Sequence, residues 1–356
     1  ISPHKTSSAA SDVYKRQVIT IKVAFSEVVN VTGTPQLTLE TGGSDAVVDY
    51  SSGTGSNTLT FNYTIGSGET SSDLDYKATS SLALNGGTIK DAALNNATLT
   101  LASPGATNSL GDNKALIVDT TVPTVTNVTS TTGDGSYKQG ETIAITIGFS
   151  EVVNVTGTPQ LTLETGGSDA VVDYSSGTGS NTLTFNYTIG SGETSSDLDY
   201  KATSSLALNG GTIKDAALNN ATLTLASPGA TNSLGDNKAL IVDTSVPTIS
   251  SVSLNAANSE LTVTFAEDVY DTDGGSGDLE AADFELSISG GVATVASTPT
   301  GITKTAQNIW ILDVNISGTA NGSETLSVVP AAGNVIFDAA GNAASTSQSN
   351  LSLIHI

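Results

Sequence analysis

Apolar and polar residues alternate in short runs along most of the chain. Between residues 57 and 65, for example, Leu59, Phe61 and Tyr63 alternate with threonine and asparagine. Such alternation is typical of a β-strand with one buried and one exposed face. The same pattern predicts strands at residues 35–40, 114–119, 142–149, 261–269 and 309–316, separated by turns rich in glycine, asparagine and proline. The residues that it places in a core include Ile143, Ile145, Phe149, Leu183, Phe185, Tyr187 and Trp310.

One long block of this pattern occurs twice. Residues 25–120 recur residue for residue as residues 149–244. The unit is roughly a hundred residues long, well above the roughly 20–50 residues of a solenoid repeat and close to the size of one β-sandwich domain. Identity on this scale indicates a recent duplication, and an assembly error in the sequence is the alternative.

The last third of the chain repeats the layout but not the sequence. "LTVTFAEDV" at residues 261–269 parallels "ITIGFSEVV" at residues 145–153, and "IFDAAGNA" parallels "IKDAALNNA". Pro123 and Pro247 stiffen the short links "VDTTVPT" and "VDTSVPT". We therefore expect an all-β chain of tandem β-sandwich domains, arranged as beads on a string. Its parts are repeat 1 (residues 18–120), repeat 2 (residues 121–244) and domain 3 (residues 245–350). Repeat 1 lacks the stretch that matches residues 122–141, so we expect it to lack an opening strand.

The two ends differ from everything between them. Residues 12–17 can be encoded as GAT GTG TAT AAG AGA CAG, and residues 351–356 as CTG TCT CTT ATA CAC ATC, which is the reverse complement. Both resemble the transposon end used to fragment DNA for sequencing libraries. We therefore expect residues 1–17 and 351–356 to be non-native tails, without stable strands and outside every sandwich. On this interpretation, residues 18–350 are a metagenomic fragment of a longer reading frame.

Composition excludes several classes of site. The chain has 12 basic and 35 acidic residues, a formal net charge of −23, and no cysteine. Its only arginine, Arg16, and both histidines, His4 and His355, lie in the terminal segments. A Ser-His-Asp triad, a cysteine nucleophile and a histidine or cysteine zinc site are therefore not expected, so we predict no enzyme. The scattered lysines predict no nucleic-acid binding, and the lack of a long apolar run predicts no membrane insertion.

The recurring "FSE", "GTPQLTL", "LALNGGTIKDA" and "VDTTVPT" resemble tandem bacterial immunoglobulin-like domains of giant repeat adhesins. Domain 3 resembles the related modules of S-layer and other surface proteins. The sequence "DAALNNA" departs from the "DxAGN" form of this class, whereas "DAAGN" at residues 338–342 keeps it. The resemblance covers residues 18–350.

The resemblance implies a structural stalk of a secreted or cell-surface protein, often stiffened by calcium. Its partners would be the neighbouring domains of the chain and, through domains outside the fragment, a host surface, a glycan or a biofilm matrix. One alternative is that these domains themselves bind glycans or proteins, for which Tyr50, Tyr63 and Tyr76 could form an aromatic platform, although core packing explains them as well. The other alternative is an accessory region of an extracellular hydrolase.

Acidic residues at both links predict metal sites. Asp119 ends a strand at the first link, Glu151 follows the strand that ends at Phe149, and Asp215 lies in a late loop. In an immunoglobulin-like sandwich these positions return to the same end, so the three carboxylates should meet between repeat 1 and repeat 2. The corresponding residues at the next link are Asp243, Glu267 and Asp338. Carboxylates are hard oxygen ligands that suit Ca²⁺, and turn capping is the alternative role.

The densest acidic stretch, "EDVYDTDGGSGDLEAAD", is a further candidate. Asp271, Asp273 and Asp278 lie in or beside its glycine-rich loop. The spacing is similar to a calcium loop but fails the full EF-hand pattern, because no glutamate stands at the twelfth position. A solvated acidic hairpin loop is the alternative.

Overall fold

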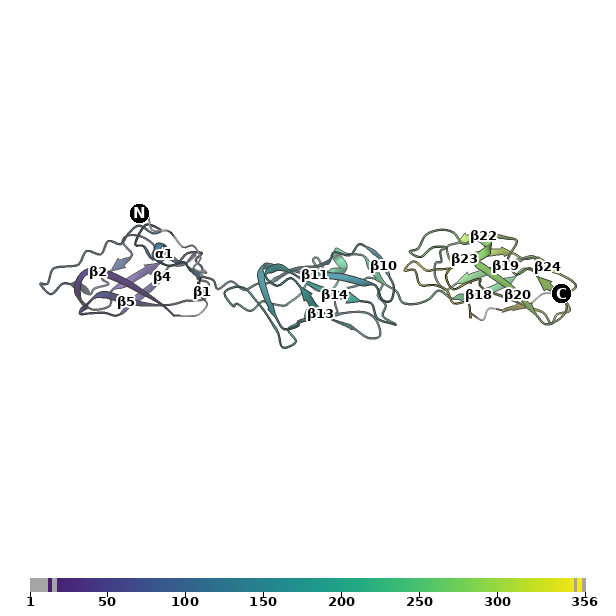
Figure 1. The fold of residues 1–356 in the computed structure, drawn as a ribbon, viewed down its shortest axis with the longest axis horizontal. Helices are drawn as coiled ribbons and strands as arrows, with labels where there is room; N and C mark the ends of the chain where they lie inside the picture. The colour runs from purple at the N-terminus through teal and green to yellow at the C-terminus, as the bar shows by residue number, and fades with distance from the viewer. Residues whose placement is uncertain (1–11, 15–17, 349–350, 354–356) are drawn as a thin grey trace, which may run out of the picture.

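The computed structural model describes residues 12–14, 18–348 and 351–353. Its regular secondary structure is almost entirely β-strand, and three bodies follow one another along the longest axis (Figure 1). Each body has its own core of buried apolar residues, and none of the three cores shares a residue with another. The described chain therefore forms three β-rich bodies, each with its own core.

Repeat 2 shows the complete arrangement. Its longest strand, β11 (Thr142–Thr156), pairs with β9 (Val125–Ser130) on one side and β14 (Ser180–Thr188) on the other. After a register shift beyond Gly148, the end of β11 pairs instead with β16 (Thr212–Lys214), which bends the strand. The other elements are β10 (Gly135–Tyr137), β12 (Gln160–Leu163), β13 (Ala170–Ser176), β15 (Leu206–Ala207), α2 (Leu234–Asn237) and β17 (Leu240–Val242).

Repeat 1 has the same order of strands, except at its start. The strand β2 (Val18–Thr32) takes the place of β11 and pairs with β5 (Ser56–Thr64) and β7 (Thr88–Lys90). The other elements are β3 (Gln36–Leu39), β4 (Ala46–Ser52), β6 (Leu82–Ala83), α1 (Leu110–Asn113) and β8 (Leu116–Val118). Within the described residues, no strand of repeat 1 corresponds to β9.

Domain 3 is built differently in detail. A four-stranded sheet has the order β18 (Ile249–Leu254), β19 (Glu260–Phe265), β23 (Ile309–Asp313) and β22 (Gly301–Ala306). The remaining elements are η1 (Ala281–Asp283), β20 (Phe284–Ser289), β21 (Thr294–Val295), β24 (Ile316–Ser317), β25 (Thr325–Pro330) and β26 (Leu351–Leu353). Trp310 on β23 is almost fully buried, as its alternation with apolar residues predicts.

The alternating pattern identifies the core of repeat 2 correctly. All the residues that it places there are buried to within a few per cent of full burial. This confirms the prediction for Ile143, Ile145, Phe149, Leu183, Phe185 and Tyr187. Period-two alternation succeeds because side chains of successive strand residues point to opposite faces.

The expectation that both tails lie outside the sandwiches without strands is wrong for two short segments. Residues Asp12–Tyr14 form β1, which pairs in parallel with β8, as β10 pairs with β17 in repeat 2. Residues Leu351–Leu353 form β26, which pairs antiparallel to β25. Ladder hydrogen bonds use the backbone alone, so an open sheet edge accepts an extended segment of unrelated sequence. The rest of both tails, residues 1–11, 15–17 and 354–356, lies outside the described residues.

Candidate metal centres

The first candidate centre lies between repeat 1 and repeat 2. Asp119 follows β8, Glu151 lies in the bent part of β11, and Asp215 follows β16. Each of the three offers one carboxylate oxygen, and these oxygens lie within 4.8 Å of one another. The structure thus brings together three residues that are far apart in the sequence and come from both sides of the link. We call this set the first cluster.

Asn219 connects two members of the first cluster, Asp215 and Asp119. Its side-chain amide donates to Asp215 Oδ2 at 2.6 Å and to the backbone oxygen of Asp119 at 3.2 Å. Its backbone N–H donates to Asp215 Oδ1 at 2.7 Å. Asn219 and Asp215 are both buried, so these bonds hold one carboxylate of repeat 2 in a fixed place against the end of repeat 1.

The second candidate centre repeats this geometry between repeat 2 and domain 3. The carboxylate oxygens of Asp243, Glu267 and Asp338 also lie within 4.8 Å of one another, and we call them the second cluster. The side-chain amide of Asn342 donates to Asp338 Oδ2 at 2.8 Å and to the backbone oxygen of Asp243 at 2.9 Å. Two links with different following domains therefore carry the same constellation.

The departure of "DAALNNA" from "DAAGN" does not change the turn that presents the asparagine. Leu218 has a positive φ of 67°, and Gly341, at the corresponding position before Asn342, has a φ of 87°. In both turns the aspartate N–H donates back to the backbone oxygen of the asparagine. A left-handed conformation is unfavourable for leucine, which indicates that the surrounding contacts hold the turn in place.

Electrostatic repulsion is concentrated in both clusters. Burial, followed by the charges of Asp119 and Asp215, raises the pKa of Glu151. Burial and the charges of Asp338 and Asp243 raise the pKa of Glu267 to about 7. Among the ion pairs of the described residues, none involves a member of either cluster. The negative charge of the two clusters is therefore not neutralised by lysine.

Two buried oxygen atoms of the first link have no hydrogen-bond partner within the described part of the chain. They are Oδ1 of Asn219 and Oε1 of Glu151. A buried oxygen without a donor is costly, and the amide nitrogen of Asn219 is already used by Asp215 and Asp119. An oxygen-rich set with orphaned acceptors fits a hard cation. The residues present therefore fit Ca²⁺ at the first link.

Repeat 1 carries the same residues at its own start, but only as half of a cluster. Glu27, Asp91 and Asn95 occupy the positions of Glu151, Asp215 and Asn219. The side-chain amide of Asn95 donates to Asp91 Oδ2 at 2.7 Å, so the turn is present. Glu27 and Asn95 are exposed, and no group of three acidic residues forms here among the described residues. A complete cluster requires the aspartate of a preceding domain.

The acidic glycine-rich loop of domain 3 does not gather its carboxylates. Asp273 forms an ion pair with Lys138 of repeat 2, with Oδ1 and Oδ2 both 2.8 Å from Nζ. Asp278 pairs with Lys304 at 2.5 Å. Asp271 belongs to no group of three acidic residues in the described ranges. Two of the three candidate ligands are thus held by lysines, and a metal site in this loop stays a prediction.

The tyrosines proposed as an aromatic platform lie mostly inside repeat 1. Tyr63 and Tyr76 are buried in the core, and their hydroxyl groups donate to Glu69 and to the backbone oxygen of Ala102. Tyr50 is half-buried and packs edge-on against Phe61. Core packing therefore accounts for them.

Sequence reasoning missed Asn219, Asn342 and the pairing of Lys138 with Asp273. The recurring "DAALNNA" and "DAAGNA" contained the signal for the asparagines, because the fourth residue after the aspartate is asparagine in both. None of the described helices has the length and apolar character needed to cross a membrane. No protein-family model and no curated protein sequence matches the chain.

Proposed function

We propose that this chain is a non-enzymatic stalk segment of a large bacterial secreted or cell-surface adhesin, in which Ca²⁺ bound between immunoglobulin-like sandwiches makes the row of domains rigid. The observation that carries the proposal is the shared composition of the two clusters. Each takes one carboxylate from the preceding domain and two from the following domain. A cation held by all three would join two domains at one point.

Calcium is the metal class that the donor set favours. The available donors are carboxylate oxygens, an amide oxygen and backbone carbonyl groups, which are hard ligands. With the cation present, the like charges of each cluster become ligands instead of a source of repulsion. Without it, two unit charges about 4 Å apart repel by about 1 kcal/mol in bulk water, and by more where solvent is excluded.

The immunoglobulin-like assignment and the adhesin type rest on the resemblance of the recurring motifs. The β-sandwich character, the end-to-end order of the bodies in Figure 1 and the short proline-containing links support a spacer role. Domains beyond this chain would carry the contact with a host surface, a glycan or a biofilm matrix. The setting would be the bacterial cell surface or the extracellular space.

Calorimetry combined with small-angle X-ray scattering tests the proposal. We expect two calcium ions per chain, one for each cluster. Scattering in calcium should give a narrow distribution of inter-domain distances, and scattering in chelator a broad one. Asp243→Ala should remove one calcium ion and loosen only the second link.

Asp268→Ala is the matched control, because it removes the same charge next to the second cluster without belonging to it. This variant should keep both calcium ions. Absence of calcium binding, together with identical scattering curves in calcium and chelator, would sink the proposal and leave the proline links as the source of rigidity.

A further inference from the structure

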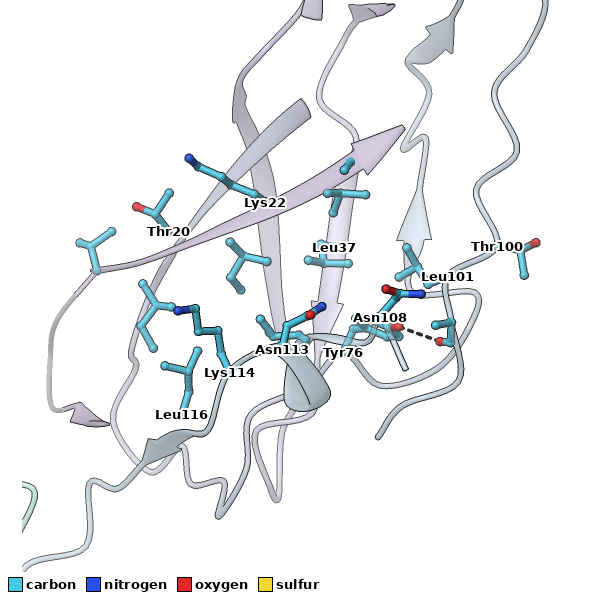
Figure 2. A pocket seen from close by; sticks show the side chains of 17 residues that line it. Thr20, Lys22, Leu37, Tyr76, Thr100, Leu101, Asn108, Asn113, Lys114 and Leu116 are labelled. Carbon is cyan, nitrogen blue, oxygen red and sulfur yellow. Dashed lines mark hydrogen bonds between the residues drawn. The ribbon is translucent and has the colours of Figure 1, made fainter. Parts of the chain in front are cut away.

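Repeat 1 has a groove where repeat 2 has a strand. In repeat 2, one edge of β11 between Ile145 and Phe149 pairs with β9. The same edge of β2 in repeat 1 pairs with no strand of the described chain and borders a groove of about 800 Å³. Figure 2 shows Lys22 of β2 on one side of this groove, Leu37 and Tyr76 within it, and Asn108 and Asn113 opposite.

The groove of repeat 1 is lined by the counterparts of the residues that hydrogen-bond to β9 in repeat 2. There the N–H of Val128 donates to the backbone oxygen of Asn232 at 2.9 Å, and the side-chain amide of Asn237 donates to the backbone oxygen of Val128 at 2.7 Å. Asn108 and Asn113 are the corresponding residues of repeat 1, and both line the groove. The backbone oxygen of Asn108 is the acceptor that an added strand needs. The side-chain amide of Asn113 donates to the backbone oxygen of Ser109 at 2.7 Å and would turn to the added strand, as Asn237 does in repeat 2.

The apolar part of the groove also corresponds. Val128 is fully buried in repeat 2, where α2 packs against β9 and Leu234 is fully buried. Leu110, the counterpart of Leu234, is only half-buried and lines the groove. Phe25 is likewise more exposed than its counterpart Phe149. One apolar side chain on a strand would cover this surface, as Val128 does.

In repeat 2, one continuous segment runs from the first cluster into β9, the strand that occupies the position of the groove. After Asp119 the chain continues to Thr124, whose N–H donates to Ser150 Oγ at 3.0 Å and whose backbone oxygen accepts from Ser150 N–H at 2.8 Å. It then enters β9. Repeat 1 has Ser26 at the position of Ser150, and it has the half cluster of Glu27 and Asp91. Repeat 1 therefore has the counterparts of the residues that contact this segment in repeat 2, both at the half cluster and along the groove.

We propose that the groove of repeat 1 binds an extended segment with the chemistry of residues 119–130, which adds as a strand antiparallel to β2 and places its leading aspartate beside Glu27 and Asp91. The occupant is the link and opening strand of a repeat of this type that is not already folded into its own domain. Its recognition elements are the aspartate and the valine at the position of Val128. The calcium part of this inference rests on the proposed function, whereas the strand part does not.

Repeat 1 and repeat 2 differ at a position that contacts the added strand, which predicts the sequence that the groove prefers. Gly148 of repeat 2 lies against the side chain of Asn127, and a Cβ at that position would overlap Asn127 Oδ1. Repeat 1 has Ala24 there. A segment with a smaller residue in place of Asn127 should therefore fit repeat 1 better than β9 itself.

A labelled peptide with the sequence of residues 119–132, added to the full chain, tests the strand part. We expect saturable binding of one peptide per chain, several-fold tighter for the Asn127→Ala peptide and at least tenfold weaker for the Val128→Asp peptide. Hydrogen exchange should slow in the segment 18–24 and stay unchanged in 142–148, and these segments differ in sequence and can be told apart. Failure of both the wild-type and the Asn127→Ala peptide to bind would overturn the proposal.

Two further outcomes separate this inference from the calcium proposal. Binding that needs no calcium and does not respond to Asp119→Ala in the peptide supports the groove and counts against a calcium site at this position. A chain that dimerises by itself with β9 seated on the edge of β2 of a second copy, in calcium or in chelator, supports the strand part, because β9 is the opening strand of a repeat of this type; slower exchange of residues 18–24 at high concentration would show it.

Discussion

The side-chain amide of Asn342 donates a hydrogen bond of 2.9 Å to the backbone oxygen of Asp243, joining domain 3 to the end of repeat 2. The same amide holds Asp338, so one residue positions a ligand and fixes the domain that precedes it. We expect Asn342→Ala to weaken calcium binding at the second cluster at least tenfold, because Asp338 Oδ2 loses its side-chain partner and the bond to the backbone oxygen of Asp243 is broken, while the two backbone donors to Oδ1 remain. Calorimetry should show one weakened and one unchanged site, and two unchanged sites would contradict the assignment.

The identical repeats provide an internal control for the role of the glutamate. Glu27 and Glu151 have the same neighbours in sequence, but only Glu151 lies beside an aspartate of a preceding domain. We expect Glu151→Gln to remove the calcium ion of the first cluster and Glu27→Gln to leave the number of bound ions unchanged. Equal effects of the two substitutions would show that a single domain is sufficient for the site.

The raised pKa of Glu267 predicts how the second link responds to pH. In metal-free protein this pKa is about 7, against an ordinary value of 4.5. The folded state then binds the proton more tightly than the unfolded state. The resulting stability is fully present below about pH 4.5 and is lost as the pH rises to about 7.

Carboxylate resonances observed by NMR should show the midpoint for Glu267 near pH 7 in chelator. Calcium should move this midpoint down, because the cation competes with the proton. Calcium affinity at the second cluster should therefore increase with pH up to about 7 and level off above it. A midpoint that is the same with and without calcium would argue against Glu267 as a ligand.

Lys138 makes a second contact across the same link. Its Nζ lies 2.8 Å from both carboxylate oxygens of Asp273 and 3.0 Å from the backbone oxygen of Gly341. We expect Lys138→Ala to widen the inter-domain angles at the second link while leaving calcium binding intact. Because Asp273 is largely exposed, salt screens this ion pair, and the difference in inter-domain angles between wild type and Lys138→Ala should be smaller at high salt. Lys77→Ala, which breaks an ion pair within repeat 1, is the control and should leave the scattering unchanged.

Repeat 1 should unfold more easily than repeat 2. Full burial of a valine such as Val128 contributes on the order of 2 kcal/mol, and repeat 1 has no counterpart among its described strands. Hydrogen exchange should be faster in residues 18–24 than in residues 142–148, whose sequences differ. Equal protection would mean that the open edge of β2 is covered in solution.

The alternating pattern was sufficient for the core of repeat 2, since burial on alternate positions is a local property. It located strands in domain 3 but not their ends, because the strands predicted at residues 261–269 and 309–316 end at Phe265 and Asp313. Convergence of Asp119, Glu151 and Asp215 was also predictable, because it follows from the order of strands in a sandwich. The roles of Asn219 and Asn342 were not predictable, since they depend on which backbone oxygen faces each side chain across the link.

Other features depend on surfaces that meet only after folding. The ion pair between Lys138 and Asp273 joins residues of two separate domains. The short strands β1 and β26 form through backbone hydrogen bonds at open edges, for which side-chain pattern carries little information. Predictions failed where the partner of a segment is set by tertiary geometry.

The division of each cluster between two domains has a consequence at the level of the gene. An internal unit brings its own glutamate, aspartate and asparagine to the domain before it and leaves one aspartate for the domain after it. Insertion or deletion of a whole unit by recombination therefore creates no incomplete joint within the array. Identical units, which favour such recombination, would let the reach of the molecule change in steps of one domain without selection for new contacts.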